Sequence, residues 1–367
     1  MYNKIKNSQI KCGYCNSKVI IKKGFKKNKF QVIQKYQCKN CRKCFTLQSQ
    51  KNITYPISKI LEAISLYNLG YPLKQVSEKI FVQDKLKIAV STISSWIKKY
   101  KNLTTYIKLR KQAKKLYSPK NIIFKKPLQH RQVYLFNYHK AKLKILPSLN
   151  KNIPTKAIEN LKNYLAKIHT SSFPHHIFDA SMENNENDNS GKPEQRSSKL
   201  KFEVLDFVKL EKHNYANKLA ALVLKSVNNN FQRHQAIQNF MLINDTSTIA
   251  TEIPVYLTKD DINYFLERDF NLELKGHNTP ITGHIDILQL RNNLIHILDY
   301  KPNAHKINPV PQLTLYALAL ASRLQIPIKY FKVAWFDETD YFEYFPLHAV
   351  YKIKDKSINL EFKEVRK

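Results

Sequence analysis

Acidic residues are scarce in the first 150 positions of this 367-residue chain, which hold 3 Asp and Glu against 34 Lys and Arg. The resulting balance of +31 excludes an acidic, solvating class of protein and predicts a polyanionic partner, nucleic acid. An anionic membrane surface fits less well, because the basic residues are not confined to one amphipathic helix. Residues 151–367 hold 28 basic and 25 acidic residues, a balance of +3, so the charge belongs to the front of the chain.

Long apolar runs and late cysteines are also missing. No run of 18 or more apolar residues occurs, which predicts that no helix spans a membrane. The first residues, MYNKIKNSQIK, contain no apolar stretch of the kind that secretory signals require. All 5 cysteines lie at or before Cys44, and CxxC pairs outside a secreted chain indicate a metal rather than disulfides. We therefore expect an intracellular protein, cytoplasmic or associated with the nucleoid.

The composition changes along the chain and divides it into segments, without any internal repeat. A cysteine segment, a helical segment and a basic segment without a recognisable motif come first. A polar stretch then predicts a disordered linker. Regular α/β patterning follows, so we expect an α/β (α+β) core with a mixed sheet flanked by helices. The segments are 8–50, 55–102, 103–180, 181–199 and 200–367.

The cysteines form two CxxC pairs, Cys12 with Cys15 and Cys38 with Cys41, separated by 22 residues. Four thiolates on two hairpin-like segments can surround Zn²⁺ tetrahedrally, and a segment this short and polar would gain folding free energy from the metal. Free buried cysteines and an iron–sulfur site are the alternatives. Cys44 follows closely and is a further candidate for the fourth thiolate.

The sequence around these pairs, at 12–15 and 37–45, resembles the zinc ribbon at the start of insertion-sequence transposase subunits. The shared features are the two knuckles and the aromatic Phe45 just after the last one. The extra Cys44 departs from that pattern. The resemblance covers roughly 40 residues and implies DNA contact, not transposition.

Residues 57–69 have apolar side chains at helical spacing, and Gly70 is placed to end this helix. A second short helix is expected over 73–80, and a third after an insert at 81–88, with Ser91 as its N-cap. The pattern resembles the helix-turn-helix of transposases or resolvases, although the insert exceeds a tight turn. An ordinary three-helix bundle is the alternative.

The third of these helices has an apolar side and a polar side. We expect the apolar side to face the core with Ile93, Trp96 and Ile97. Small hydroxyl side chains suit an approach to base edges, whereas lysines hold phosphates without reading sequence. The expected base-facing residues are Ser91, Thr92, Ser94 and Ser95, and the expected phosphate ligands are Lys98, Lys99 and Lys101.

Two predicted strands, 281–288 and 294–301, flank an Asn-Asn turn and together predict a hairpin. A hairpin can bring Asp286 and Asp299 together, and Lys301 shares a strand face with Asp299. Two carboxylates suit Mg²⁺ or Mn²⁺, and an ammonium group can position water or neutralise phosphate charge. A surface Asp–Lys pair on a strand is the alternative.

Three linked motifs surround these residues, in the order Gly283-His-Ile-Asp286, Ile297-Leu-Asp299-Tyr-Lys301 and Gln312-Leu-Thr-Leu-Tyr316. They resemble the PD-(D/E)xK nuclease superfamily in its RecB-type exonuclease branch, over roughly residues 205–346. The resemblance implies a restriction-endonuclease-like core and metal-dependent cleavage. It assigns metal binding to Asp286, Asp299 and the carbonyl of Tyr300, catalysis to Lys301, and substrate contact or orientation of the site to Gln312 and Tyr316.

The same resemblance raises further points about individual residues. Glu252, on the preceding predicted strand, is interpreted as a supporting acid near the metal, the alternative being a cross-strand partner of a basic residue. The branch usually has a histidine ligand on a helix, and both His213 and His234 lie in predicted helical stretches. His284 shares a strand face with Asp286 and could approach substrate. An iron–sulfur cluster, held by many relatives, is excluded in this domain because no cysteine follows Cys44.

We therefore expect a DNA nuclease dependent on Mg²⁺ or Mn²⁺. A zinc ribbon and a helical segment would dock on the phosphate backbone, and a flexible linker would connect them to the nuclease domain. The charge fits RNA as well as DNA. The alternatives are a non-catalytic DNA-binding regulator and an accessory protein of a mobile element. The sequence predicts no membrane partner and no particular oligomeric state.

Overall fold

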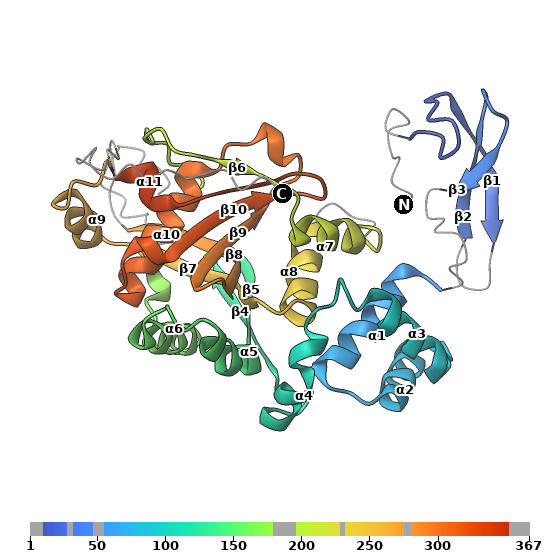
Figure 1. Ribbon diagram of the computed structural model, residues 1–367, viewed down its shortest axis with the longest axis horizontal. Helices are drawn as coiled ribbons and strands as arrows, with labels where there is room; N and C mark the ends of the chain where they lie inside the picture. Colours follow the sequence, from blue (N-terminus) through green and yellow to red (C-terminus); the bar gives the residue numbers. More distant parts are fainter. Residues whose placement is uncertain are drawn as a thin grey trace, which may run out of the picture.

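The computed structural model describes residues 10–27, 32–46, 55–178, 196–227, 232–272, 274 and 280–351. These residues form a small three-stranded sheet, a group of helices, and an α/β domain built on an eight-stranded mixed sheet (Figure 1). Among them, no helix combines the length and the apolar character that crossing a bilayer requires.

The N-terminal sheet, drawn in blue in Figure 1, is antiparallel in the order β1-β2-β3. Most side chains of the first strand are exposed, and the few buried apolar residues of this region include Ile10 and Tyr36. Hydrophobic burial therefore contributes little to its stability, as the polar composition predicted. The strands are β1 Ile20–Lys27, β2 Val32–Cys38 and β3 Cys44–Thr46.

Three helices follow, and the first ends where the sequence predicted. Gly70 has φ 118°, a left-handed conformation that suits glycine, and it caps the helix. The second helix runs four residues beyond the predicted 73–80, so the connection to the third is 85–89 rather than 81–88. The helices are α1 Ile57–Leu69, α2 Leu73–Asp84 and α3 Val90–Tyr100.

The start of α3 differs from the prediction. Ala89, in an extended conformation, is the residue that precedes the helix, and no side chain caps its free amides. Ser91 therefore lies inside the first turn and is not the N-cap, because the helical conformation already begins at Val90. The predicted core side chains Ile93, Trp96 and Ile97 are buried.

The large sheet has the order β4-β5-β7-β8-β9-β10-β11-β6, and only β9 and β10 pair in parallel. The predicted hairpin is β8 and β9, joined by Asn292 and Asn293, whose φ angles of 53° and 60° match the positive-φ turns of tight hairpins. The strands are β4 Ile123–His130, β5 Gln132–His139, β6 Leu210–Glu211, β7 Thr248–Leu257, β8 Ile281–Arg291, β9 Leu294–Tyr300, β10 Phe331–Phe336 and β11 Tyr341–Tyr344.

Helices cover both faces of this sheet (Figure 1). One apolar core packs α10 and α6 against the strands, and a second core packs α7 and α8 against the opposite face. The second core continues into α1–α3, so the helical segment is part of it. The remaining helices are α4 Ile107–Leu116, α5 Lys140–Ile145, α6 Thr155–Lys167, α7 Tyr215–Leu224, α8 Arg233–Asn244, α9 Lys259–Leu266, α10 Val310–Leu324 and α11 Pro346–Val350.

The sheet begins earlier in the chain than residue 200. The hairpin β4–β5 lies within the segment whose fold was unassigned, and it joins the sheet where Tyr138 pairs with Ala250. Its turn centres on Arg131, with φ 54°, and contains none of the Gly or Asn residues that mark such turns. The domain boundary predicted at 200 is therefore wrong. Of the predicted linker, residues 181–195 lie outside the described residues, and Ser197 bonds to Thr282 of β8.

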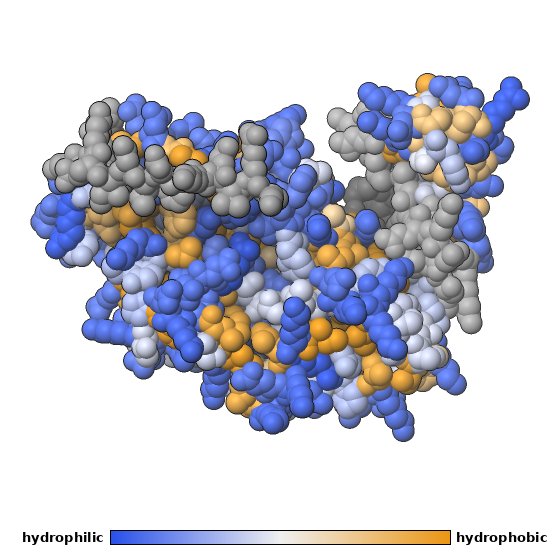
Figure 2. Space-filling view, in the orientation of Figure 1, coloured by the Kyte–Doolittle hydropathy of each residue, from blue (hydrophilic) through white to orange (hydrophobic). Residues whose placement is uncertain are grey.

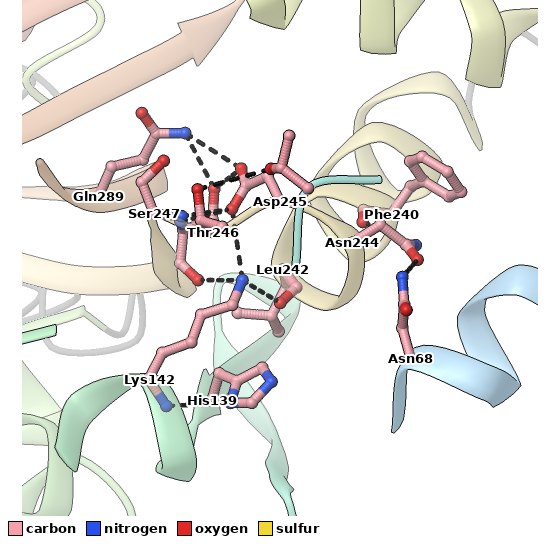
Figure 3. Close-up of polar contacts among 12 residues, drawn as sticks. Asn68, His139, Lys142, Phe240, Leu242, Asn244, Asp245, Thr246, Ser247 and Gln289 are labelled. Carbon is pink, nitrogen blue, oxygen red and sulfur yellow. Dashed lines mark hydrogen bonds and ion pairs between the residues drawn. The ribbon is translucent and has the colours of Figure 1, made fainter. Parts of the chain in front are cut away.

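Hydrogen bonds fix the helical segment directly to the sheet domain, and the structure thus differs from a purely flexible connection. The amide of Asn68 in α1 donates to Asn244 at the end of α8 (2.8 Å), and Asn244 donates to Ser65 (2.9 Å). Close by, the buried ammonium of Lys142 bonds to the carbonyl of Leu242 (2.8 Å) and lies 3.3 Å from Asp245 (Figure 3). Such buried, fully bonded polar groups specify one relative placement of the helices.

Candidate functional site

The four paired cysteines meet in the N-terminal sheet. Their sulfur atoms all lie within 4.8 Å of one another, and the distances from Cys12 to Cys41 and from Cys15 to Cys38 are both 3.6 Å. Backbone amides near Cys41 lower the pKa of Cys38 to about 6, which favours the thiolate. Cys44 lies on β3 opposite Gln37 and is not part of this group. The four thiols could hold a structural metal such as zinc.

A second group of polar residues gathers in the large sheet, where β7 and β8 bend together. Thr251 pairs with Ile287 and Ile253 with Ile285, so Glu252 and the residue between Ile285 and Ile287, Asp286, occupy the intervening positions of the two strands. Glu252 has φ 53°, which costs about 1 kcal/mol or more for a residue other than glycine. Strained conformations of this kind concentrate at functional sites.

The bend changes which side chains face each side of the sheet. Ala250 and Ile253, three apart, belong to the same apolar core, whereas a regular strand would place them on opposite faces. In β8, Ile285 and Ile287 belong to different cores although they are two apart. Asp286 lies at the centre of this irregularity.

Asp286 and Asp299 meet across β8 and β9. Ile287 pairs with Leu298, and the two aspartates take the next position, where the pairing ends. Burial and the charge of Asp286 raise the pKa of Asp299 well above its ordinary value. Burial acts in the same direction on Asp286, but interactions with His234 and Asp299 hold its pKa below the ordinary value. The two carboxyls therefore behave as a pair that holds one proton.

Lys301 extends from the end of β9 to the same place. Its ammonium nitrogen lies 2.8 Å from Asp299 Oδ2, and the Asp299 side chain is only 4% exposed. Burial opposes the charge of the lysine, but Asp299 and Asp286 raise its pKa, so it stays protonated. Asp299 Oδ2 faces the Lys301 ammonium, whereas the buried Oδ1 has no hydrogen-bond donor among the described residues. Oδ1 could therefore serve as a ligand to a further cation.

Helix α8 supplies two more side chains. His234 Nδ1 lies 3.4 Å from Asp286 Oδ2, and Gln238, one turn later, donates to Glu252 Oε1 at 2.7 Å. Of the two histidines considered from sequence, His234 therefore reaches the site, whereas His213 is exposed just before α7. Burial, together with the charge of Asp286, raises the pKa of Glu252 to about 8. Its contacts make Glu252 a part of this group and not a partner of a basic residue.

One side of the site is formed by three residues in contact, Gly283, Gln312 and Tyr316. A Cβ atom at position 283 would lie 2.2 Å from the Tyr316 ring, so only glycine allows the ring to pack there. Gln312 donates to the Tyr316 hydroxyl at 2.8 Å. Tyr316 is 6% exposed, which suits orientation of the site more than contact with a substrate.

The donor set of the Asp286 and Asp299 carboxylates and the His234 imidazole could hold a divalent cation. The backbone amide of Tyr300 lies 3.4 Å from Asp286 Oδ2. As placed, however, these ligand atoms do not converge within 4.8 Å, because the ammonium of Lys301 pairs with Asp299 and Glu252 pairs with Gln238.

A different cluster of potential ligands does converge among the described residues. It consists of His305, Asp337 and Asp340. Asp337 already accepts bonds from the backbone amides of Ala304, Thr339 and Asp340, which makes it a turn-capping residue.

The predicted DNA-contacting residues lie on α3. Ser91, Ser95, Lys98 and Lys99 are exposed there, and Lys101 is exposed just after the helix. Thr92 and Ser94 are partly buried. The hydroxyl of Ser95 donates to the carbonyl of Thr92 in its own helix (2.8 Å).

Sequence reasoning missed Gln238, Tyr134 and Arg196. Gln238 follows His234 by four residues, a spacing that places both on one helix face and could have indicated it. Tyr134 and Arg196 come from segments that had no predicted structure, and only the folded chain brings them beside Glu252 and Asp286.

No protein-family model matches this chain, and no curated protein or solved structure is significantly similar to it.

Proposed function

We propose that this chain is a metal-dependent nuclease that hydrolyses phosphodiester bonds of DNA. The observation that carries the proposal is the meeting of Asp286, Asp299, Lys301 and His234 with Glu252 at one bend of the sheet. A structural ion-pair network would not require two buried carboxyls with oppositely shifted pKa values and a strained glutamate in the same place.

Each residue has a role that follows from its position. Asp286, Asp299 and His234 would hold Mg²⁺ or Mn²⁺, which supplies Lewis-acid stabilisation of the phosphate when bound. Lys301, which keeps its charge, neutralises the phosphate and orients the attacking water. Glu252 supports the site from β7, and Gln238 fixes its carboxyl group. The Tyr316 ring packs against Gly283 and so fixes the position of β8 relative to α10.

The helical segment and helix α4, which follows it, would bind the DNA backbone. Helix α4 has the sequence IKLRKQAKKL, without an acidic residue, and its lysines are exposed. Arg110 is fixed by bonds to the carbonyls of Tyr67 (2.6 Å) and Tyr71 (3.0 Å). A hollow of about 490 Å³ lies between α1 and α4 and is lined by Tyr67, Ile107, Arg110, Lys111, Lys114 and Lys115.

The surface agrees with this assignment. Hydrophilic side chains cover most of the surface around α4 at the lower edge of Figure 2. The four N-terminal thiolates, holding a structural zinc ion, would stabilise a further DNA-contacting unit, and the lysines of α3 would add phosphate contacts.

Cleavage assays test the proposal. Purified full-length protein is incubated with linear, circular, single-stranded, double-stranded and branched DNA in the presence of Mg²⁺, Mn²⁺ or EDTA. We expect cleavage with the cations and none with EDTA. DNA binding without any cleavage, under all these conditions, would contradict the nuclease proposal and favour a non-catalytic DNA-binding protein.

A further inference from the structure

A ring stack borders the carboxylates on the side of β5. Tyr134 of β5 lies flat on His284 of β8, with ring centroids 3.6 Å apart and planes 5° apart. His130 in turn contacts His284, with 3.0 Å between His130 Nδ1 and His284 Nε2. His175 continues this chain, 2.8 Å from His130 Nε2. Contacts with neighbouring side chains therefore fix the position of the Tyr134 ring.

Arg196 is attached to this stack. Its Nη2 donates to the hydroxyl of Tyr134 at 2.8 Å. The backbone beside it is fixed to β8, because the amide of Ser197 donates to the carbonyl of Thr282 at 3.0 Å. Among the residues that the structure describes, no carboxylate pairs with this guanidinium, which is partly exposed. A fixed cation that pairs with no carboxylate of the described residues is positioned to bind an anion from outside the chain.

The stack lies between Arg196 and the acidic residues along β8. Arg196 pairs with Thr282 of β8 in a parallel bridge, and His284 and Asp286 follow Thr282 at alternate positions of the strand. Tyr134 stacks on His284, the middle one of these three residues. Arg196 is therefore the basic edge of the same site whose centre is acidic.

We propose that Arg196, oriented by Tyr134, binds a phosphate adjacent to the one that is cut in the DNA strand. This inference rests on the proposed nuclease function and assigns part of its substrate-binding site. A guanidinium has five donors in one plane, and Tyr134 uses one of them, so a phosphate can take two of the others. A carboxylate-rich centre repels a polyanionic strand, and a fixed positive group next to it offsets that repulsion.

The test uses the full chain and DNA oligonucleotides in which one phosphate at a time is replaced by a neutral methylphosphonate. For the wild-type protein we expect one position next to the cleavage site at which the replacement lowers kcat/KM by about 10- to 100-fold, as loss of a charged hydrogen bond implies. Arg196→Ala should lower kcat/KM on unmodified DNA by a similar factor and should be insensitive to replacement at that position.

Two further variants separate charge from orientation. Arg196→Lys keeps the charge but lacks the planar fork, and Tyr134→Phe keeps the stack but removes the hydroxyl that holds the guanidinium. The kcat/KM of both variants should lie between that of the wild type and that of Arg196→Ala. Arg268→Ala is the control, because Arg268 likewise contacts a tyrosine, its guanidinium lying over the Tyr264 ring at 3.6 Å, after α9 and away from this stack. It should behave as the wild type.

Binding measurements keep this inference separable from the nuclease proposal. Fluorescence anisotropy with the same oligonucleotides reports the contact even if the protein cuts no DNA. One phosphate whose replacement weakens wild-type binding but not that of Arg196→Ala supports the contact. Equal sensitivity of both proteins at every phosphate, in binding and in cleavage, would overturn it.

Discussion

The ring of Tyr316 fills the space that a side chain at position 283 would occupy. A Cβ atom there would lie 2.2 Å from ring atom Cε1, far inside van der Waals contact. Gly283 and Tyr316, 33 positions apart in the chain, are therefore complementary in size. The large ring of α10 requires the absence of a side chain at this position of β8.

Replacing Gly283 by alanine should destabilise the protein by about 1–3 kcal/mol, because the added methyl group overpacks the contact with Tyr316. Combining it with Tyr316→Leu, which removes the clashing ring atom, should recover part of the loss. Urea unfolding measures both. Gly13→Ala is the control, since nothing lies within 4 Å of a Cβ there. Additive effects of the two site substitutions would show that the contact does not matter.

Asp299→Asn should lower DNA cleavage by about 1000-fold, which corresponds to ~4 kcal/mol in the activation free energy. The amide keeps the shape but cannot carry the negative charge that a divalent cation needs. DNA affinity should change little, since the basic front half supplies it. Asp260→Asn, at an exposed position on α9, is the control. Undiminished cutting by the Asp299 variant would place the active site elsewhere.

Glu252 should make the stability of the metal-free protein fall with rising pH. Its pKa is raised from 4.5 to about 8 in the folded state. The stabilisation from the neutral form is thus complete below about pH 4.5 and lost as the pH rises through about 8. Glu252→Gln should remove that slope, and above pH 8 its free energy of unfolding should exceed the wild-type value by roughly 5 kcal/mol.

Chemical denaturation in EDTA at several pH values measures this difference. The two proteins should be nearly equal in stability at pH 4 and diverge steadily above it. Parallel curves across the whole range would mean that the Glu252 carboxyl is not held neutral in the folded protein.

Zinc content should depend on four of the five cysteines. Cys38→Ser removes a thiolate from the tetrahedral group and should abolish stoichiometric zinc, whereas Cys44→Ser should retain it. Elemental analysis of the purified proteins measures the content. Zinc retained by the first variant and lost from the second would mean that Cys44 is the true ligand.

DNA affinity should fall steeply as salt rises, and α4 should account for part of the slope. Neutralising Lys111, Lys114 and Lys115 to Gln should reduce the slope of log K against log salt by about two to three. A matched triple variant at the exposed positions Lys151, Lys156 and Lys167, in and before α6, should leave it unchanged. Equal slopes for both would remove α4 from the DNA-binding surface.

Local sequence patterns predicted those helices and hairpins whose ends are marked by their own residues. The β8–β9 hairpin was predictable because two apolar runs flank an Asn-Asn turn, and α1 because Gly70 ends it. The β4–β5 hairpin was not, since its turn at Arg131 has no local marker. The choice of His234 over His213 depends on how α8 packs against β8, which periodicity does not specify.

Helix α8 carries His234 near its first turn, beside Asp286, and Asn244 at its last residue, bonded to Asn68 of α1. A helix of this length is a stiff rod of roughly 18 Å. In the proposed nuclease, DNA bound by the helical segment would therefore lie at a fixed distance from the proposed cleavage site. Cleavage should then occur at a constant number of nucleotides from the DNA segment that the helices bind.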